Sequence, residues 1–161
     1  MTDWLELIDV PMDAVINGFE VLLGGYPELC DTLRSEGKLG GYACVAQQDG
    51  LPILIMALGE PNEAKSATRL EFCQEKVRRL AANTAHSLSF ESRDPDNNKW
   101  GGAARGKRYI VSFSGMPERL DEYFALAVLY HLQDLSEQEI LRLLLAHDNP
   151  YRSELHLENF G

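Results

Sequence analysis

A chain of 161 residues has the usual size of one folded domain and is long enough to bury a hydrophobic core. Its 25 acidic and 15 basic side chains give a formal net charge of −10, which argues against nucleic acid or an anionic membrane surface as a partner, because both are bound through lysine and arginine. No apolar run approaches the roughly 20 residues that a membrane-spanning helix needs.

The three cysteines carry neither a disulfide pattern nor a metal-site pattern. Cys30, Cys44 and Cys73 each lie in an apolar context, and none belongs to a CxxC pair. The first residues are acidic, whereas a secretory leader begins with basic residues. These features predict reduced, buried thiols in a cytoplasmic protein.

Two helices are expected before residue 40. Apolar residues recur at helical spacing over residues 12–23, with Pro11 at a first-turn position. The glycines at 24 and 25 interrupt this pattern. Pro27 then opens a second, shorter helix that Gly37 ends.

A β-hairpin follows. Asp49-Gly50 separates the apolar runs 42–46 and 51–58, and Asp-Gly between two such runs is a strong hairpin signal. The second run is almost continuously apolar, so we expect its strand to be buried on both faces of the sheet. Pro52 lies at the start of this strand, where a missing N–H is tolerated.

Residues 66–84 give the clearest helix in the chain. Six positions form its apolar stripe: Leu70, Cys73, Val77, Leu80, Ala81 and Thr84. Residues 87–90 alternate in the manner of a short strand, and the polar stretch 92–99 is typical of a loop.

The last elements are one strand and two helices. Residues 107–114 are rich in β-branched and aromatic side chains, and Pro117 then begins a helix whose inner face extends to His131. Ser136 and Glu139 form a capping-box sequence at the start of a last helix over residues 136–147. Residues 148–161 form an arm or tail.

This order of elements predicts an α+β fold with a mostly antiparallel sheet flanked by helices. A doubly wound parallel sheet would require repeated βα units, which the chain lacks. We expect one domain over residues 1–161, with its core in 12–132, an added helix at 136–147 and a tail at 148–161.

No catalytic or metal-binding motif is complete. The four histidines lack the spacing of a metal site, and no Gly-x-Ser-x-Gly sequence marks a nucleophile. His86 ends the long helix, where it either caps the helix or enters a cleft. Basic residues gather around three glycines, where they form either an anion cradle or a solvated loop: Lys99, Arg105, Lys107 and Arg108.

The order of motifs over residues 41–132 resembles the haem-degrading-domain-like family, also called GlcG-like. The matching pieces are the hairpin 43–58, the helix 72–86 with Glu75-Lys76-Val77 and its His86-Ser87 exit, Gly101-Gly102, the strand 109–113, Ser114-Gly115-Met116-Pro117 and an acidic residue at Asp121. The resemblance implies a profilin-like fold, assembly into homo-oligomers and, as in some relatives, binding of haem or corrinoid-type ligands. His86, Gly101 and Gly102 match motif positions.

Two hypotheses about function follow. In the first, a small ligand of the haem or corrinoid type lies between the end of the long helix and Trp100-Gly101-Gly102. Trp100 forms an apolar wall, Arg105 or Lys107 meets an acidic group of the ligand, and His86 is the polar or axial contact.

In the second hypothesis the chain is a non-enzymatic interaction or assembly module. The sheet or an apolar helix face builds a homo-oligomer or docks a protein partner, and the leucines at 141, 144 and 145 with the tail 151–160 suit that role. The sequence favours this module and leaves ligand binding open.

Overall fold

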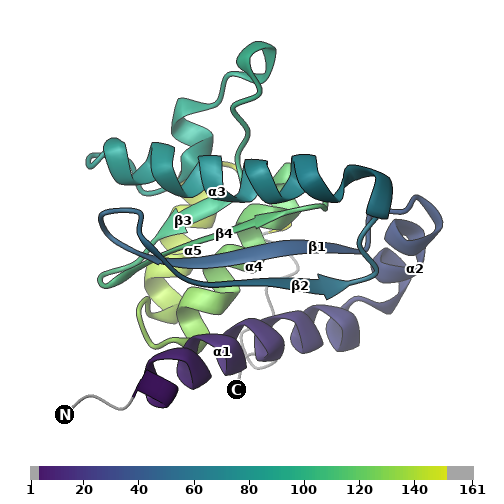
Figure 1. The fold of residues 1–161 in the computed structure, drawn as a ribbon, viewed down its shortest axis with the longest axis horizontal. Coiled ribbons are helices and arrows are strands. Elements are labelled where there is room, and N and C mark those ends of the chain that lie inside the picture. The colour runs from purple at the N-terminus through teal and green to yellow at the C-terminus, as the bar shows by residue number, and fades with distance from the viewer. Residues whose placement is uncertain (1–3, 152–161) are drawn as a thin grey trace.

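One antiparallel sheet with helices on both faces organises the protein, whose computed structural model describes residues 4–151 (Figure 1). The helices are α1 (Trp4–Gly25), α2 (Pro27–Ser35), α3 (Ser66–Ala82), α4 (Glu118–His131) and α5 (Glu137–Ala146). The strands are β1 (Gly40–Gln47), β2 (Pro52–Gly59), β3 (Ala103–Arg105) and β4 (Tyr109–Ser114). Three short 3-10 turns complete the described elements: η1 (Glu63–Lys65), η2 (Ser89–Ser92) and η3 (Pro95–Asn97).

The strands pair in the order β2-β1-β4-β3, and every pair is antiparallel. The expected hairpin is present: Gly50 adopts a φ of +88°, which a glycine reaches without steric strain. In the register of the sheet, Cys44 of β1 lies opposite Ile55 of β2 and Ser112 of β4. The α+β class with an antiparallel sheet is confirmed.

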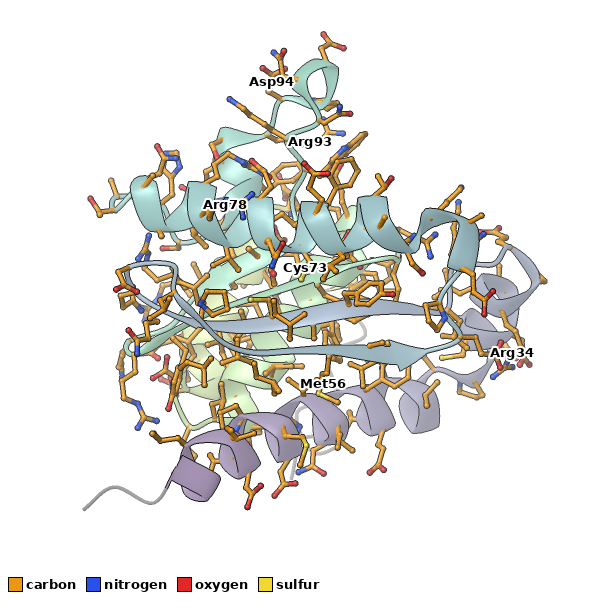
Figure 2. All side chains as sticks on the ribbon, viewed as in Figure 1. Arg34, Met56, Cys73, Arg78, Arg93 and Asp94 are labelled. Atoms are coloured by element: carbon orange, nitrogen blue, oxygen red, sulfur yellow. The ribbon has the colours of Figure 1, made fainter. Side chains whose placement is uncertain are left out.

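Alternate residues of the central strands face two separate hydrophobic clusters. On one face, Val45 and Phe113 belong to the large cluster that includes α1, α4 and α5. On the other, Cys44 and Ile110 belong to a smaller cluster with α3. Figure 2 shows Cys73 on the side of α3 that faces the sheet, and Met56 between β2 and α1. The two faces therefore have different partners, and among the α-helices of residues 4–151 only α3 covers its face.

Two expectations about the strands were wrong. The β2 strand is an edge strand of the sheet, and its side chains are half-buried or exposed, whereas the central strands β1 and β4 are buried on both faces. Apolar composition alone does not separate an edge strand from a central one, because pairing partners lie far away in the sequence. Residues 87–90 form no strand: Leu88 makes one bridge to Ala104, and η2 follows. The short strand β3 was not expected.

The helices also differ from expectation at their ends. The first helix begins at Trp4, so Pro11 lies inside it and not in its first turn. The long helix ends at Ala82, and Asn83, not His86, occupies its C-cap. The capping box of α5 is confirmed, since Ser136 and Glu139 bond each other's backbone N–H groups.

The added helix α5 packs into the large cluster through Ile140 and Leu144. All three cysteines are free and buried. Within residues 4–151, no helix combines the length and the apolar character needed to cross a bilayer. Residues 152–161, which hold most of the expected tail, lie outside the described part of the chain.

Candidate functional site

A cavity of about 570 Å³ lies between the N-terminal half of α3, the loop before β3 and the turn from β4 into α4. Its apolar lining is provided by Phe72, Trp100, Met116 and Pro117. Six charged side chains also line it: Lys38, Lys65, Arg69, Lys76, Glu118 and Asp121. An aromatic wall beside several cations is suited to a ligand that is part apolar and part anionic.

A buried ion pair forms one side of the cavity. Lys76 is 2% exposed, and its Nζ donates to the Phe113 carbonyl at 2.7 Å and lies 3.4 Å from Asp121 Oδ2. Asp121 is equally buried, and its other oxygen, Oδ1, accepts from the Met116 N–H at 3.0 Å. Burial raises the pKa of Asp121 to about 7, although the nearby Lys76 charge opposes this rise.

Two adjacent glycines allow close packing around the Lys76–Asp121 pair and against the Phe90 ring. A Cβ on Gly102 would lie 2.7 Å from Lys76 Nζ and 2.9 Å from the Phe113 carbonyl oxygen. A Cβ on Gly101 would lie 2.9 Å from the Phe90 ring, and the Gly101 N–H donates to Glu118 Oε2 at 2.9 Å. Both glycines were expected to contact a ligand. Both are buried, and neither is among the residues that line the cavity.

Trp100 lines this cavity, which lies at the N-terminal half of α3 and not at the end of the helix where the small-ligand hypothesis placed its pocket. Two arginines hold the Trp100 loop. Arg79 donates to the Trp100 carbonyl, to the Ser89 carbonyl at 2.7 Å and to Glu75 at 2.7 Å. The Arg93 guanidinium lies 5.4 Å from the centre of the Trp100 ring. These contacts hold Trp100 in its position at the cavity.

Two of the four cations that line the cavity lack a partner among the described residues 4–151. Neither Lys65 nor Arg69 has a side-chain hydrogen bond or ion pair with any residue in the described range 4–151, and Arg69 Nη1 is buried without an acceptor. Lys38 lies 3.7 Å from Glu36 at the surface. A buried guanidinium N–H without an acceptor is unfavourable, so an anion from outside the chain would satisfy it.

Arg105 and His86 lie away from this cavity, at the C-terminal end of α3. Arg105 Nε donates to the His86 carbonyl at 3.0 Å, and its guanidinium also contacts the Leu80 carbonyl and Gln48 Oε1. Arg105 therefore satisfies carbonyl groups at the end of the helix and presents no free fork to a ligand. His86 contributes its backbone to this contact, and its Nδ1 is buried.

Lys107 lies in a different place again. Its Nζ is 3.4 Å from Glu139, and it lines a second cavity of about 480 Å³ with Tyr130 and His131. Of the six residues singled out from the sequence, the structure brings only Trp100 to the cavity between α3 and the β4–α4 turn.

The lining of the Trp100 cavity does not fit a histidine-held haem. Among its described residues there is no histidine or cysteine, and Met116 is the one side chain of a common haem-ligand type. Elsewhere in residues 4–151, no group of histidine, cysteine, aspartate and glutamate side chains is arranged to hold a metal ion.

Lys76 and Arg69 were not singled out from the sequence, although the residue pattern of α3 contains a signal for both. Lys76 stands three residues after Cys73 and four before Leu80, so a charge interrupts the buried stripe of α3. Arg69 and Phe72 precede it on the same helix face. A charged residue within an apolar helix stripe is expensive to bury and therefore marks either an ion pair or a site.

Comparison of the chain with protein-family models, curated proteins and solved structures gave no match. The function is therefore inferred from the geometry and charge of the cavity.

Proposed function

We propose that the protein binds a small organic anion with an apolar body in the cavity beside Trp100. The observation that carries this proposal is the pair of unpartnered cations, Lys65 and Arg69, next to the aromatic side chains Phe72 and Trp100. An anionic group satisfies the cations, while the apolar body of the ligand lies against the rings.

The charge balance of the chain supports an anionic ligand. With a net charge of −10, the chain has an excess of carboxylates for its cations. Arg34, Arg79 and Arg108 each have a carboxylate partner within 3.3 Å. Arg69 has none among the described residues, even though one of its nitrogen atoms is buried. Guanidinium groups bind carboxylates through two parallel hydrogen bonds, which makes a carboxylate the favoured anion.

The GlcG-like relationship, with its profilin-like fold, is part of the same proposal. It supports ligand binding in a sheet-and-helix protein of this kind, and Lys76, Gly102 and Asp121 all lie in motifs quoted for the resemblance. The composition of the cavity favours an anion without a histidine-bound metal centre.

Fluorescence of Trp100 tests the binding function. The Trp4→Phe protein keeps Trp100 as its single tryptophan. We expect phenylpropionate to change this fluorescence saturably, the neutral phenylpropionamide to bind about tenfold more weakly, and phenylpropylamine to bind more weakly still. Arg69→Gln should weaken phenylpropionate binding about tenfold, whereas the matched change Arg142→Gln at an exposed position of α5 should leave it unchanged. Equal binding of the three compounds would contradict the proposal.

A second candidate function is self-assembly through the edge strand β2, in line with the interaction-module hypothesis. Apart from β1, no described residue pairs with the backbone of β2, and residues 51–59 carry no charged side chain. An antiparallel edge is self-complementary about a two-fold axis, so a second copy can pair with it even though each chain is acidic elsewhere. The mass of the protein in solution tests this function.

A further inference from the structure

The Lys76 amine has a position that a purely structural lysine does not require. Its contacts to Phe113 and Asp121 use two of the three N–H donors of an ammonium group, and its side chain lines the cavity. A well-packed apolar pair at the same place would hold α3 against the β4–α4 turn at least as well, because a buried ion pair must repay the desolvation of both charges. A reactive role explains why an amine and a carboxylate are buried together.

We infer that Lys76 is the nucleophile of a carbonyl-binding site and forms an imine with an oxo acid bound in the cavity, with Asp121 relaying the protons. This inference rests on the proposed anion-binding function. It adds the class of ligand, namely an acid that also carries an aldehyde or ketone group.

Asp121 is placed for a proton relay. Its Oδ1 is held by the Met116 N–H at 3.0 Å, while Oδ2 faces Lys76 Nζ at 3.4 Å. The carboxylate is thus oriented by the backbone of the β4–α4 turn, and one oxygen remains directed at the amine. An adjacent general base is one of the ways in which a protein activates a nucleophile.

The chemistry balances without any further reactant. Asp121 takes a proton from the Lys76 ammonium, and the neutral Nζ attacks the carbonyl carbon, whose oxygen receives that proton. The new C–N bond gives a carbinolamine once a second proton has passed from Nζ to Asp121. Asp121 then protonates the hydroxyl group, the C–O bond breaks, and one water leaves. A protonated imine and an ionised Asp121 remain, so total charge is unchanged.

Helix geometry sets the shape of the ligand. Arg69, Phe72 and Lys76 are spaced i, i+3 and i+7 on one face of α3, so Arg69 and Lys76 begin about 10 Å apart along the helix. A ligand that reaches both needs its carboxylate and its carbonyl at opposite ends of an apolar spacer. Phe72 lies between the two positions, and Trp100 lines the same cavity. An aromatic aldehyde acid meets these requirements.

Reductive trapping of the full-length protein tests the inference. The probe is para-carboxybenzaldehyde with cyanoborohydride, which reduces an imine to a stable amine, and the modified lysine is located by peptide mass spectrometry. We expect Lys76 to be labelled about tenfold more than the exposed Lys38, Lys65 and Lys99, because the bound aldehyde is held next to its amine. Benzaldehyde, which lacks the carboxylate, should lose this preference.

Two variants and one inert analogue complete the test. Lys76→Arg keeps the charge and should abolish the selective label, whereas Lys99→Arg should not alter it; circular dichroism checks that both fold. Labelling of the exposed lysines without Lys76 in the unmodified protein would overturn the inference. If Lys76 is not labelled but para-carboxybenzyl alcohol, which has no aldehyde group, changes Trp100 fluorescence in the Trp4→Phe protein, the binding function stands and only the imine is rejected. If neither compound binds, both proposals fail.

Discussion

At the scale of single residues, the site depends on a charge that is buried where the helix pattern predicts an apolar side chain. Lys76 can occupy that place because Gly102 leaves room for its ammonium group. Asp121 and the Phe113 carbonyl also accept hydrogen bonds from this group. Gly102 lies in the loop before β3, Phe113 in β4 and Asp121 in α4. A change in packing around Lys76 is therefore expected to alter the proposed binding site as well.

Substitution of Gly102 tests this coupling. Its φ of +122° is unfavourable for any other residue, and a Cβ would come within 2.9 Å of Asp121. We expect Gly102→Ala to lower the free energy of unfolding by about 2–3 kcal/mol and to weaken phenylpropionate binding. Urea denaturation gives the first quantity and Trp100 fluorescence the second.

Gly24→Ala is the matched control, because a Cβ on Gly24 in α1 has no atom within 4 Å. It should leave stability unchanged or raise it by up to about 1 kcal/mol. Equal effects of the two substitutions would contradict the packing role of Gly102.

A second buried carboxylate gives a prediction about pH. Glu122 of α4 is completely buried; its Oε2 lies 2.8 Å from Asn149 Nδ2 and 3.3 Å from Arg119, and its Oε1 has no hydrogen-bond partner among the described residues. Burial raises the pKa of Glu122 from an ordinary 4.5 to about 7. Between these values the folded protein holds a proton that the unfolded chain releases, so the unfolding free energy falls as pH rises.

Glu122→Gln cannot ionise and should lack this part of the pH dependence. We expect the variant to gain stability relative to the unmodified protein as pH rises from about 4.5 to about 7, with no further change at higher pH. Denaturation curves of both proteins across this range measure the difference. The raised pKa of Asp121 acts in the same direction but is common to both proteins. A stability difference that is independent of pH would refute the assignment.

At the scale of elements, features that depend on neighbouring residues could be predicted from the sequence. Features that depend on pairing between distant strands could not. The Asp49-Gly50 hairpin, the α3 stripe and the Ser136 capping box each depend on residues close together in the chain. The hairpin and the capping box are present, and the stripe is buried at Cys73, Val77 and Leu80, although Thr84 lies beyond the end of α3. The edge position of β2 and the existence of β3 depend on pairing with strands elsewhere. Trp100 was singled out from the sequence, but the α3 residues that line the same cavity were not, because the pocket was expected at the opposite end of the helix.

The β2 edge provides the prediction at this scale. We expect the unmodified protein to be dimeric in sedimentation and Ala57→Lys to be monomeric, because a lysine on an edge strand opposes pairing. Ala82→Lys, the same change at an exposed position of α3, should leave the dimer intact. A monomeric unmodified protein at every concentration would exclude assembly through β2.

At the scale of the whole molecule, the acidic character of the chain and the cationic lining of one cavity point to the same conclusion. Arg34, Arg79 and Arg108 pair with carboxylates, whereas Lys65 and Arg69 beside this cavity have no partner among the described residues 4–151, and one nitrogen of Arg69 is buried. Figure 2 places Arg93 and Asp94 in the loop that projects beyond α3, in the segment that leads to Trp100. The sheet and its helices thus place the loop before β3, the β4–α4 turn and one face of α3 around the Trp100 cavity.

The most direct measurement of this account is a nitrogen-15 correlation spectrum of the protein titrated with phenylpropionate. The account predicts saturable shifts confined to the Trp100 indole, the backbone of residues 68–72 and the backbone of Gly115 and Met116. Shifts centred on Lys107 and His131 at the second cavity, or scattered over the surface without saturation, would contradict it.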